Sequence, residues 1–304
     1  MASRKTSTRK AIATGESMAT QTVKRRRAAE RTRKIAIAKL NRQRKGGRGA
    51  KGPAHAGAGV LIAEGDSWFD YPFHDVLSDL EDQYGFDVES VAHKGDTVEG
   101  MAFSDGQLDD FSRCVSKVLR GGVRPRAILL SGGGNDVAGE EFPILLNHAT
   151  SSSPGLNNSV LTGVIDERLS DAYVTILTAI TEVCRQQIGT LIPIVVHGYD
   201  YPVADGRGFW GGWGPLPGPW LEPGFRKKGY ASMAYRAQVC VQLIDRFNQM
   251  LARIAGKGPF AHVRHLDLRN TLARGATYKD WWANELHPTE KGFKEVTRKF
   301  AAMV

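Results

Sequence analysis

An apolar run passes into a polar turn in Gly59-Val60-Leu61-Ile62-Ala63-Glu64-Gly65-Asp66-Ser67-Trp68. The apolar half is short and rich in branched side chains, as a strand buried on both faces is. Similar runs recur along the chain with longer helical segments between them, which predicts a parallel α/β sheet covered by helices on both faces. The strands are expected at residues 59–63, 88–92, 126–130, 191–197 and 262–268.

The segments between these runs divide into helices and two long loops. Helices are expected at residues 74–83, 108–119, 167–187, 231–254 and 288–303. The last would begin at Pro288, because proline is favoured at the first helical position. Residues 149–158 are rich in Ser, Pro, Gly and Asn, and residues 206–229 carry Trp210, Trp213 and Trp220 among Gly and Pro. Loops of this length in a compact domain are often lids or binding loops.

The positive charge of the chain is concentrated at its N-terminus. The 304 residues carry a net charge of +9, but residues 1–51 hold 17 Lys and Arg against two acids, which leaves a net of −6 for the remainder. This arm has few large apolar side chains and cannot offset the entropy of ordering with a core of its own. We expect residues 1–20 to be disordered and residues 22–44 to become helical when their charge is neutralised. The predicted domains are a basic arm with a Gly-rich linker, 1–58, and an α/β domain, 59–304.

The basic residues within 24–51 suit a polyanion as partner. They would bind phosphates by charge and counterion release, without reading a base sequence. The absence of aromatic residues from this stretch excludes base stacking. A nucleic acid or an anionic surface would satisfy the same charges. A solvated tail with no specific partner is the alternative.

Composition also bears on the compartment. The three cysteines, Cys114, Cys184 and Cys240, are too scattered for a disulfide framework or a CxxC zinc site. The longest apolar run, 191–196, is far shorter than the roughly 20 residues that span a bilayer, and the N-terminus lacks the apolar core of a signal peptide. We therefore expect a cytoplasmic protein without a transmembrane segment.

Polar residues gather where three of the expected strands end, which is the edge at which open parallel sheets bind ligands. Ser67 follows the first strand on a tight turn, which suits a nucleophile and equally a helix N-cap. Gly95 follows the second strand and Asn135 the third. A backbone N–H and a side-chain amide at these positions could donate to the oxyanion of a tetrahedral intermediate, although Gly-Gly-Asn-Asp also fits an ordinary turn.

A serine nucleophile needs a base, and the chain has eight histidines. His287 lies beyond the last expected strand and directly before a helix, from where it can reach a serine at the first strand. His197, at the end of the fourth strand, is the second candidate. Surface or packing roles are expected for His55, His74, His93, His148, His262 and His265.

Four blocks of the chain resemble the SGNH, or GDSL-type, hydrolases in order and approximate spacing. They are Gly65-Asp66-Ser67, Gly95, Gly133-Gly134-Asn135-Asp136 and His287-Pro288. The resemblance extends from Gly59 to the C-terminus. It implies a flavodoxin-like three-layer α/β/α fold and ester hydrolysis through an acyl-enzyme, as in esterases, lipases and carbohydrate O-acyl esterases. It further implies Ser67 as nucleophile, His287 as base, and an oxyanion hole made by the Ser67 amide, Gly95 and Asn135, without a metal or other cofactor.

One position departs from the family pattern. The family usually has an aspartate three residues before the histidine, and this chain has Asn284. An amide oxygen can accept a hydrogen bond from the imidazole but cannot stabilise imidazolium by charge. Asp280 is as good a candidate as Asn284 for orienting His287, Glu285 is a weaker one, and a main-chain carbonyl is a further possibility.

The resemblance leaves the substrate open. Trp210, Trp213 and Trp220 could support a sugar or cover an acyl chain, or simply pack their loop onto the body. Acyl transfer to an alcohol would use the same intermediate as hydrolysis. The alternative function is an anion-binding or scaffolding protein that acts through its basic arm and has a weakened hydrolase domain.

Overall fold

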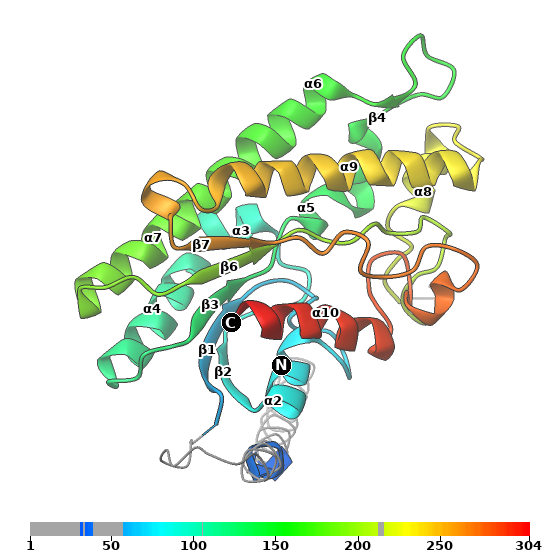
Figure 1. Cartoon of the computed structure of the whole chain (residues 1–304). Coiled ribbons are helices and arrows are strands. Elements are labelled where there is room, and N and C mark those ends of the chain that lie inside the picture. The colour runs from blue at the N-terminus through cyan, green and yellow to red at the C-terminus, as the bar shows by residue number, and fades with distance from the viewer. Residues whose placement is uncertain (1–30, 33, 39–56, 105, 212–215) are drawn as a thin grey trace, which may run out of the picture. The chain divides into compact units, whose positions relative to one another are not determined.

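The computed structural model describes residues 31–32, 34–38, 57–104, 106–211 and 216–304 (Figure 1). The chain divides into two compact units, residues 1–59 with 80–87, and residues 60–79 with 88–304. In the first unit the described residues between 31 and 38 are helical, and the Ala58 N–H donates to the Gly85 carbonyl at 3.0 Å. The rest of the basic arm lies outside the described residues. This part includes residues 1–20, which were expected to be disordered, and most of the predicted polyanion-binding stretch 24–51.

Five strands form the central sheet, in the order β2-β1-β3-β6-β7. Their bounds are β1 Gly59–Glu64, β2 Phe86–Ser90, β3 Ala127–Leu130, β6 Ile194–His197 and β7 Val263–Leu266. The pairs β1–β3, β3–β6 and β6–β7 are parallel. All five predicted strands are confirmed, with ends shifted by a few residues. The order is that of a flavodoxin-like sheet, whose strand order reverses between β1 and β3 and opens a crevice at their carboxyl ends.

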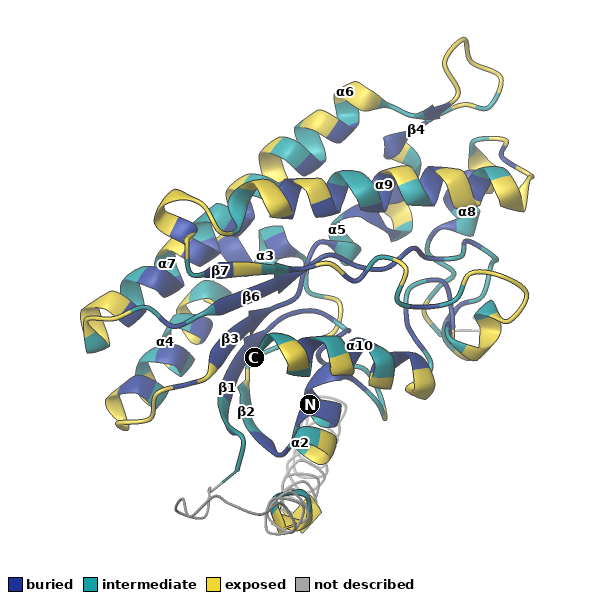
Figure 2. Ribbon diagram, in the orientation of Figure 1, coloured by how far each residue is buried: buried dark blue, intermediate teal, exposed yellow. Residues whose placement is uncertain are grey.

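Helices cover both faces of this sheet. Figure 1 shows α4 (Gln107–Arg120), α7 (Ser170–Ile188) and α9 (Met233–Ile254) on one side and α10 (Glu290–Met303) on the other. The short α3 (Val98–Phe103) lies against α7, and α2 (Val76–Tyr84) connects β1 to β2. β3 and β6 are buried along their whole length because helices cover both of their faces (Figure 2). The predicted three-layer α/β/α class is confirmed.

The expected start of the last helix is wrong. α10 begins at Glu290, and Thr289 is its N-cap, with its side chain accepting the Gly292 N–H at 3.2 Å. Proline has no side-chain acceptor for this position, whereas threonine has one. Pro288 instead forms an isolated antiparallel bridge with Trp282. This bridge pairs the two ends of the loop that carries His287.

The two expected loops contain regular structure. β4 (Leu146–Asn147) and β5 (Gly155–Leu156) form an antiparallel pair around residues 148–154, so the first loop is largely the tip of a hairpin. The second contains α8 (Glu222–Lys227), which has a proline in its first turn. The helix expected at 167–187 begins earlier, because α6 (Asn158–Leu161) and a π-helical stretch (Thr162–Leu169) run directly into α7. Across the described residues, no helix combines the length and apolarity that a membrane crossing needs.

Candidate active site

The turn after β1 places Ser67 at the carboxyl edge of the sheet. Glycine is required at position 65, because a Cβ there would lie 2.6 Å from the Cβ of Ser131. The Asp66 carboxylate accepts the Trp68 N–H at 3.0 Å, which closes the turn around Ser67. The side chain of Ser67 is therefore held by a rigid backbone at the switch point of the sheet.

Ser67 and His287 lie in hydrogen-bond contact. The distance from Ser67 Oγ to His287 Nε2 is 2.7 Å, although the two residues are 220 positions apart in the chain. On the other side of the ring, His287 Nδ1 lies 2.9 Å from Asn284 Oδ1. Because an amide oxygen can only accept, Nδ1 carries the proton and Nε2 is free to accept from the serine hydroxyl. This tautomer is the one that a general base for Ser67 requires.

The orientation of the Asn284 amide follows from its other contacts. Oδ1 also accepts the backbone N–H groups of Leu286 and His287, at 3.0 and 2.9 Å. Nδ2 donates to the hydroxyl of Tyr71 at 3.0 Å. A flipped amide would turn its NH₂ group toward three donors, so these bonds hold the oxygen toward His287.

Tyr71 makes a second contact with the same histidine. Its ring stacks on the His287 imidazole, with centroids 4.2 Å apart and planes 20° apart. Trp220 contacts the imidazole edge to face at 5.5 Å. Burial lowers the pKa of His287 to about 3, and it raises the pKa of Tyr71 to about 12. Both side chains are therefore neutral near pH 7.

The other candidates for orienting His287 lie elsewhere. Asp280 is exposed, and its main-chain carbonyl accepts the Thr289 hydroxyl. Glu285 is fully buried and its carboxylate accepts four backbone N–H groups, from Gly206, Trp220, Leu221 and Glu222. Two of these amides, those of the N-cap Leu221 and of Glu222, open α8, where an anion is favoured. Glu285 thus joins Gly206 and residues 220–222 to the His287 loop.

His197, the second candidate base, has no contact with Ser67 in this arrangement. It is fully buried, and its Nε2 lies 2.7 Å from Ser131 Oγ, which in turn donates to Asp66 Oδ1 at 2.8 Å. The hydroxyl of Tyr199 donates to the other oxygen of Asp66 and accepts the Gly134 N–H at 3.2 Å. This buried network holds the carboxylate of Asp66, the residue before Ser67, in place.

Asn135 and Gly95 were expected to donate to an oxyanion, the first from its side chain and the second from its backbone, and they lie on adjacent turns. Asn135 Nδ2 donates to the Asp96 carbonyl at 2.8 Å, which uses one of its two protons and ties the turn after β3 to the Gly95 turn. Asp136 joins the same turns, accepting the N–H groups of Val98 and Glu99 at 2.8 and 3.2 Å. Gly95 is exposed and has a φ of +90°, a conformation that favours glycine.

The tryptophans of the 206–229 segment differ in environment. Trp220 touches His287, as described above. Trp210 is 72% exposed and stacks on Phe209 at 5.5 Å, and Phe209 contacts the edge of Tyr71 at 5.8 Å. An aromatic surface therefore runs from His287 outward through Tyr71. Trp213 lies outside the described residues.

Sequence reasoning assigned no role to Ser131, Tyr199 or Tyr71. Ser131 and Tyr199 come at the ends of β3 and β6, so the strand-end rule that singled out Ser67 could have found them. Tyr71 has no comparable signal, because its partner Asn284 is 213 residues away in the chain.

A pocket adjoins Ser67, His287 and Asn135. It encloses about 630 Å³, a volume that includes space open to solvent. Its walls come from the turn after β3, the segment after β6, and α9. The site thus combines a serine–histidine pair, adjacent hydrogen-bond donors and a cavity beside them.

Comparison with solved structures finds similar chains at low sequence identity. An aryl esterase of M. smegmatis is 12% identical with a TM-score of 0.46, and the match covers 81% of this chain and 98% of that one. An acetyl xylan esterase of Geobacillus stearothermophilus is 13% identical with a TM-score of 0.37, covering 81% and 94%. The catalytic domain of peptidoglycan O-acetyltransferase A of Streptococcus pneumoniae is 11% identical with a TM-score of 0.40, covering 81% and 93%.

Comparison with curated protein sequences finds no match. A family model does match: residues 56–294 fit that of the GDSL-like lipase/acylhydrolase family, a span that includes Ser67, Asn135 and His287. The chain therefore belongs to the GDSL-like lipase/acylhydrolase family of ester hydrolases.

Proposed function

We propose that this ester hydrolase works through a serine acyl-enzyme, with Ser67 as nucleophile and His287 as base. The observation that carries the proposal is the 2.7 Å contact between Ser67 Oγ and His287 Nε2, in the tautomer set by Asn284. A neutral imidazole with a free Nε2 can take the hydroxyl proton as Oγ forms its bond to the ester carbonyl carbon.

The reaction then proceeds in two halves. The C–O bond to the alcohol breaks as His287 returns its proton to the leaving oxygen, which releases the alcohol and leaves the acyl group on Ser67. A water molecule next loses a proton to His287 and attacks the acyl carbon. The bond to Oγ breaks, Oγ recovers the proton, and the carboxylic acid is released.

The oxyanion of each tetrahedral intermediate needs donors aimed at it. We assign this role to the backbone N–H groups of Ser67 and Gly95 and to the second Nδ2 proton of Asn135. The bond from Asn135 to the Asp96 carbonyl supports this assignment, because it holds the amide on the Gly95 turn. Each donor of this kind is worth about 3 kcal/mol of transition-state stabilisation.

Asn284 and Tyr71 act on His287 as positioning residues in this proposal. Asn284 holds the ring in its tautomer but contributes no negative charge to imidazolium. The stacked ring of Tyr71 presents its negative face to the same imidazole, and such a contact stabilises a cation by about 1 kcal/mol or more when it is desolvated. Asp280, exposed and without contact to His287, has no part in this scheme.

The aromatic side chains beyond His287 are proposed to contact the alcohol half of the ester. His287 must protonate the leaving oxygen, so that half lies on the histidine side of Ser67. Trp220 and Trp210 belong to the aromatic surface on this side. Trp213 is proposed with them from its place in the same segment.

The proposal is tested by covalent labelling. A fluorophosphonate should inactivate hydrolysis of p-nitrophenyl butanoate with a stoichiometry of one, because an activated serine displaces fluoride from phosphorus and forms a stable Ser–O–P bond. Mass spectrometry of the digested protein should find the adduct on the peptide that contains Ser67. An adduct on any other serine, or inactivation without an adduct, contradicts the assignment.

Removing the Tyr71 hydroxyl should lower activity moderately. In Tyr71→Phe the stacked ring remains but Asn284 Nδ2 loses its acceptor, and a hydrogen bond of this kind is worth about 1 kcal/mol, or about fivefold in kcat. Tyr71→Leu also loses the stacked ring and should fall further. The measurement is kcat and KM for p-nitrophenyl butanoate from pH 4 to 9.

Tyr230→Phe is the matched control for this prediction. It removes a tyrosine hydroxyl that is bonded to the Gly155 N–H and the Asn147 carbonyl, without contact to His287. Its kcat should stay within twofold of the wild type. Equal losses of kcat in Tyr230→Phe and Tyr71→Phe would show that Tyr71 acts only on the stability of the fold.

A further inference from the structure

The hydroxyl of Tyr199 lies between the turn that carries Ser67 and the turn that carries Asn135. It donates to Asp66, the residue before Ser67. It also accepts the N–H of Gly134, the residue before Asn135, at 3.2 Å. Burial raises the pKa of Tyr199 well above its usual value, so the hydroxyl keeps the proton that it donates. One oxygen atom thus contacts the neighbours of two residues that the proposed mechanism brings together.

The ring of Tyr199 is held by its packing. It is 7% exposed, and it contacts Trp68 edge to face at 5.2 Å and Phe247 at 5.7 Å between centroids. A Cβ at Gly133 would lie 2.5 Å from the Phe247 ring, and a Cβ at Gly134 would lie 3.2 Å from the Tyr199 ring. The two glycines therefore let the turn after β3 lie directly against these rings.

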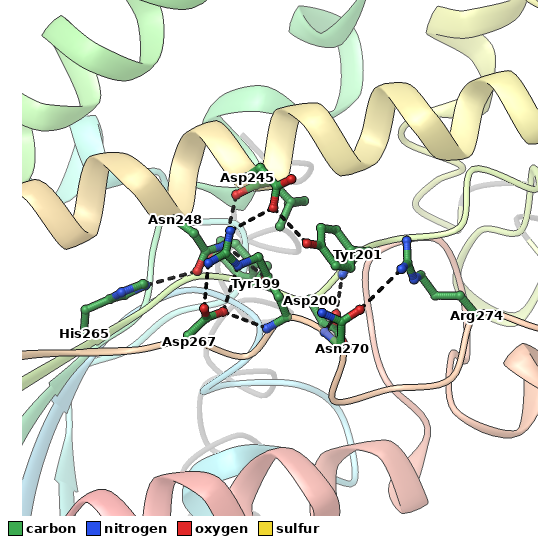
Figure 3. Close-up of polar contacts among 11 residues, drawn as sticks. Tyr199, Asp200, Tyr201, Asp245, Asn248, His265, Asp267, Asn270 and Arg274 are labelled. Atoms are coloured by element: carbon green, nitrogen blue, oxygen red, sulfur yellow. Dashed lines mark hydrogen bonds and ion pairs between the residues drawn. The ribbon is translucent and has the colours of Figure 1, made fainter.

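The backbone around Tyr199 is anchored as well, as Figure 3 shows. The side-chain amide of Asn248, on α9, donates to the Tyr199 carbonyl at 3.4 Å. The Tyr201 hydroxyl donates to Asp245 of the same helix at 2.8 Å. Asp200 is buried, and its carboxylate accepts three backbone N–H groups at 2.6–2.8 Å, from Tyr201, Asn270 and Leu272. The segment after β6 is thereby fixed to α9 and to the segment after β7.

A second side chain also ties the two turns. Ser131 donates to Asp66 at 2.8 Å, but it stands at the end of β3, four positions before Asn135. The bond from Tyr199 reaches the residue next to Asn135. Tyr199 therefore acts closer to the amide whose second Nδ2 proton is assigned to the oxyanion.

We propose that Tyr199 is a positioning residue, whose hydroxyl sets the distance between the Ser67 nucleophile and the Asn135 oxyanion donor. The inference rests on the proposed serine mechanism. The Tyr199 ring lines the pocket, but its hydroxyl is bonded to the two turns. A donor stabilises an oxyanion only when it lies within about 3.1 Å of it. A small shift of the turn after β3 would therefore weaken the contribution of Asn135 without weakening the binding of the ester.

Tyr199→Phe tests this role because it removes the hydroxyl and keeps the ring. We expect kcat for p-nitrophenyl butanoate to fall about tenfold, since the oxyanion donor loses its alignment. KM should stay within twofold of the wild type, since the ring remains in the pocket. Rates are expressed per active site, titrated with the fluorophosphonate, so that unfolded molecules do not count. An unchanged kcat would overturn the proposal.

A double-mutant cycle with Asn135→Ala separates positioning from a general loss of order. Asn135→Ala should lower kcat by about 10²-fold to 10³-fold. If Tyr199 acts through Asn135, adding Tyr199→Phe to this variant should lower kcat by less than a further twofold. A tenfold loss in both backgrounds would overturn the proposal. A wild-type kcat in Asn135→Ala would instead overturn the oxyanion assignment of the proposed function.

Tyr173→Phe is the matched control. Tyr173 is fully buried, and its hydroxyl donates to the Gly132 carbonyl, just after β3, at 2.8 Å. Both tyrosine variants should have a lower thermal unfolding midpoint than the wild type, because each leaves a buried polar group without its partner. Tyr173→Phe should nevertheless keep kcat within twofold of the wild type. Equal losses of kcat in the two variants would show that Tyr199 acts only on the stability of the fold.

Asp66→Asn reaches the same contact from its other end, and it decides the question should Tyr199→Phe fail to fold. Its amide oxygen can still accept from Trp68 and Ser131, which both donate to Oδ1. Its NH₂ group replaces the oxygen that accepts from the Tyr199 hydroxyl. We expect kcat to fall at least fivefold, and by less than twofold when Asn135 is already alanine. A loss that persists in full in the Asn135→Ala background would overturn the proposal.

Discussion

Ser67→Ala should lower kcat for p-nitrophenyl butanoate by about 10⁴-fold to 10⁶-fold, as expected when the nucleophile of such a pair is removed. Without Oγ no acyl-enzyme can form, and His287 and the oxyanion donors can only assist direct attack by water. Because Ser67 Oγ is bonded to His287 and not to the core network, the fold should survive, with the thermal unfolding midpoint within a few degrees of the wild type. Burst kinetics and circular dichroism measure the two effects separately.

Ser131→Ala provides the matched control, because the structure holds a second serine–histidine pair. Ser131 Oγ lies 2.7 Å from His197 Nε2 and donates to Asp66. Its removal leaves two buried polar groups with one partner fewer, which should cost about 1–3 kcal/mol of unfolding free energy. The variant should still form a fluorophosphonate adduct. If Ser131→Ala abolished labelling and Ser67→Ala did not, the nucleophile would be Ser131.

Asn284→Asp should raise kcat at least tenfold. In a chymotrypsin-type triad the reverse exchange costs about 10⁴ in kcat through the wrong imidazole tautomer. Asn284 already holds the correct tautomer, so the gain expected here is the smaller one from a negative charge beside imidazolium. The site can accept an aspartate: Oδ1 would keep its three N–H donors, and the new Oδ2 would replace Nδ2 at the Tyr71 hydroxyl, which can rotate to donate. The measurement is the steady-state rate on p-nitrophenyl butanoate.

The pH profile of the same variant gives an independent readout. Burial lowers the pKa of His287 to about 3 in the wild type, so its neutral, basic form persists down to low pH. A carboxylate at position 284 favours imidazolium and raises the pKa of His287. The acidic limb of kcat/KM should therefore move to higher pH in Asn284→Asp. A gain in kcat without this shift would mean that the carboxylate acts on something other than His287.

A fall in kcat for Asn284→Asp would contradict the prediction. It would mean that the amide, with its Nδ2 bond to Tyr71, is the partner for which this site is built. Asn284→Ala is the reference for a site without a partner at His287 Nδ1, because it removes both the tautomer control and the Tyr71 contact. Its kcat should lie below that of the wild type in either case.

The sheet and the elements around it were predictable from the sequence because their signals are local. A buried parallel strand is an apolar run, as Ala127–Leu130 is, and five such runs lie in β1, β2, β3, β6 and β7. The predicted start of α10 was two residues too early. Pro288 suits the first position of a helix, but Thr289 supplies the side-chain acceptor that caps it. α8 was missed because its six residues lie within a segment dominated by Gly, Pro and Trp.

Sequence by itself determined the fold class, the strand ends that carry Ser67, Gly95 and Asn135, and the position of His287 beyond the last strand. These follow from periodicity and from the rule that parallel strands present their carboxyl ends at one edge. Only the tertiary structure decided which group contacts His287 Nδ1, since the choice between Asn284 and Asp280 depends on how the loop closes through the Trp282–Pro288 bridge. The tertiary structure alone places Tyr71 beside Asn284, and places α9 and the turn after β3 around the same pocket. Such contacts depend on packing between distant segments, and no local pattern encodes them.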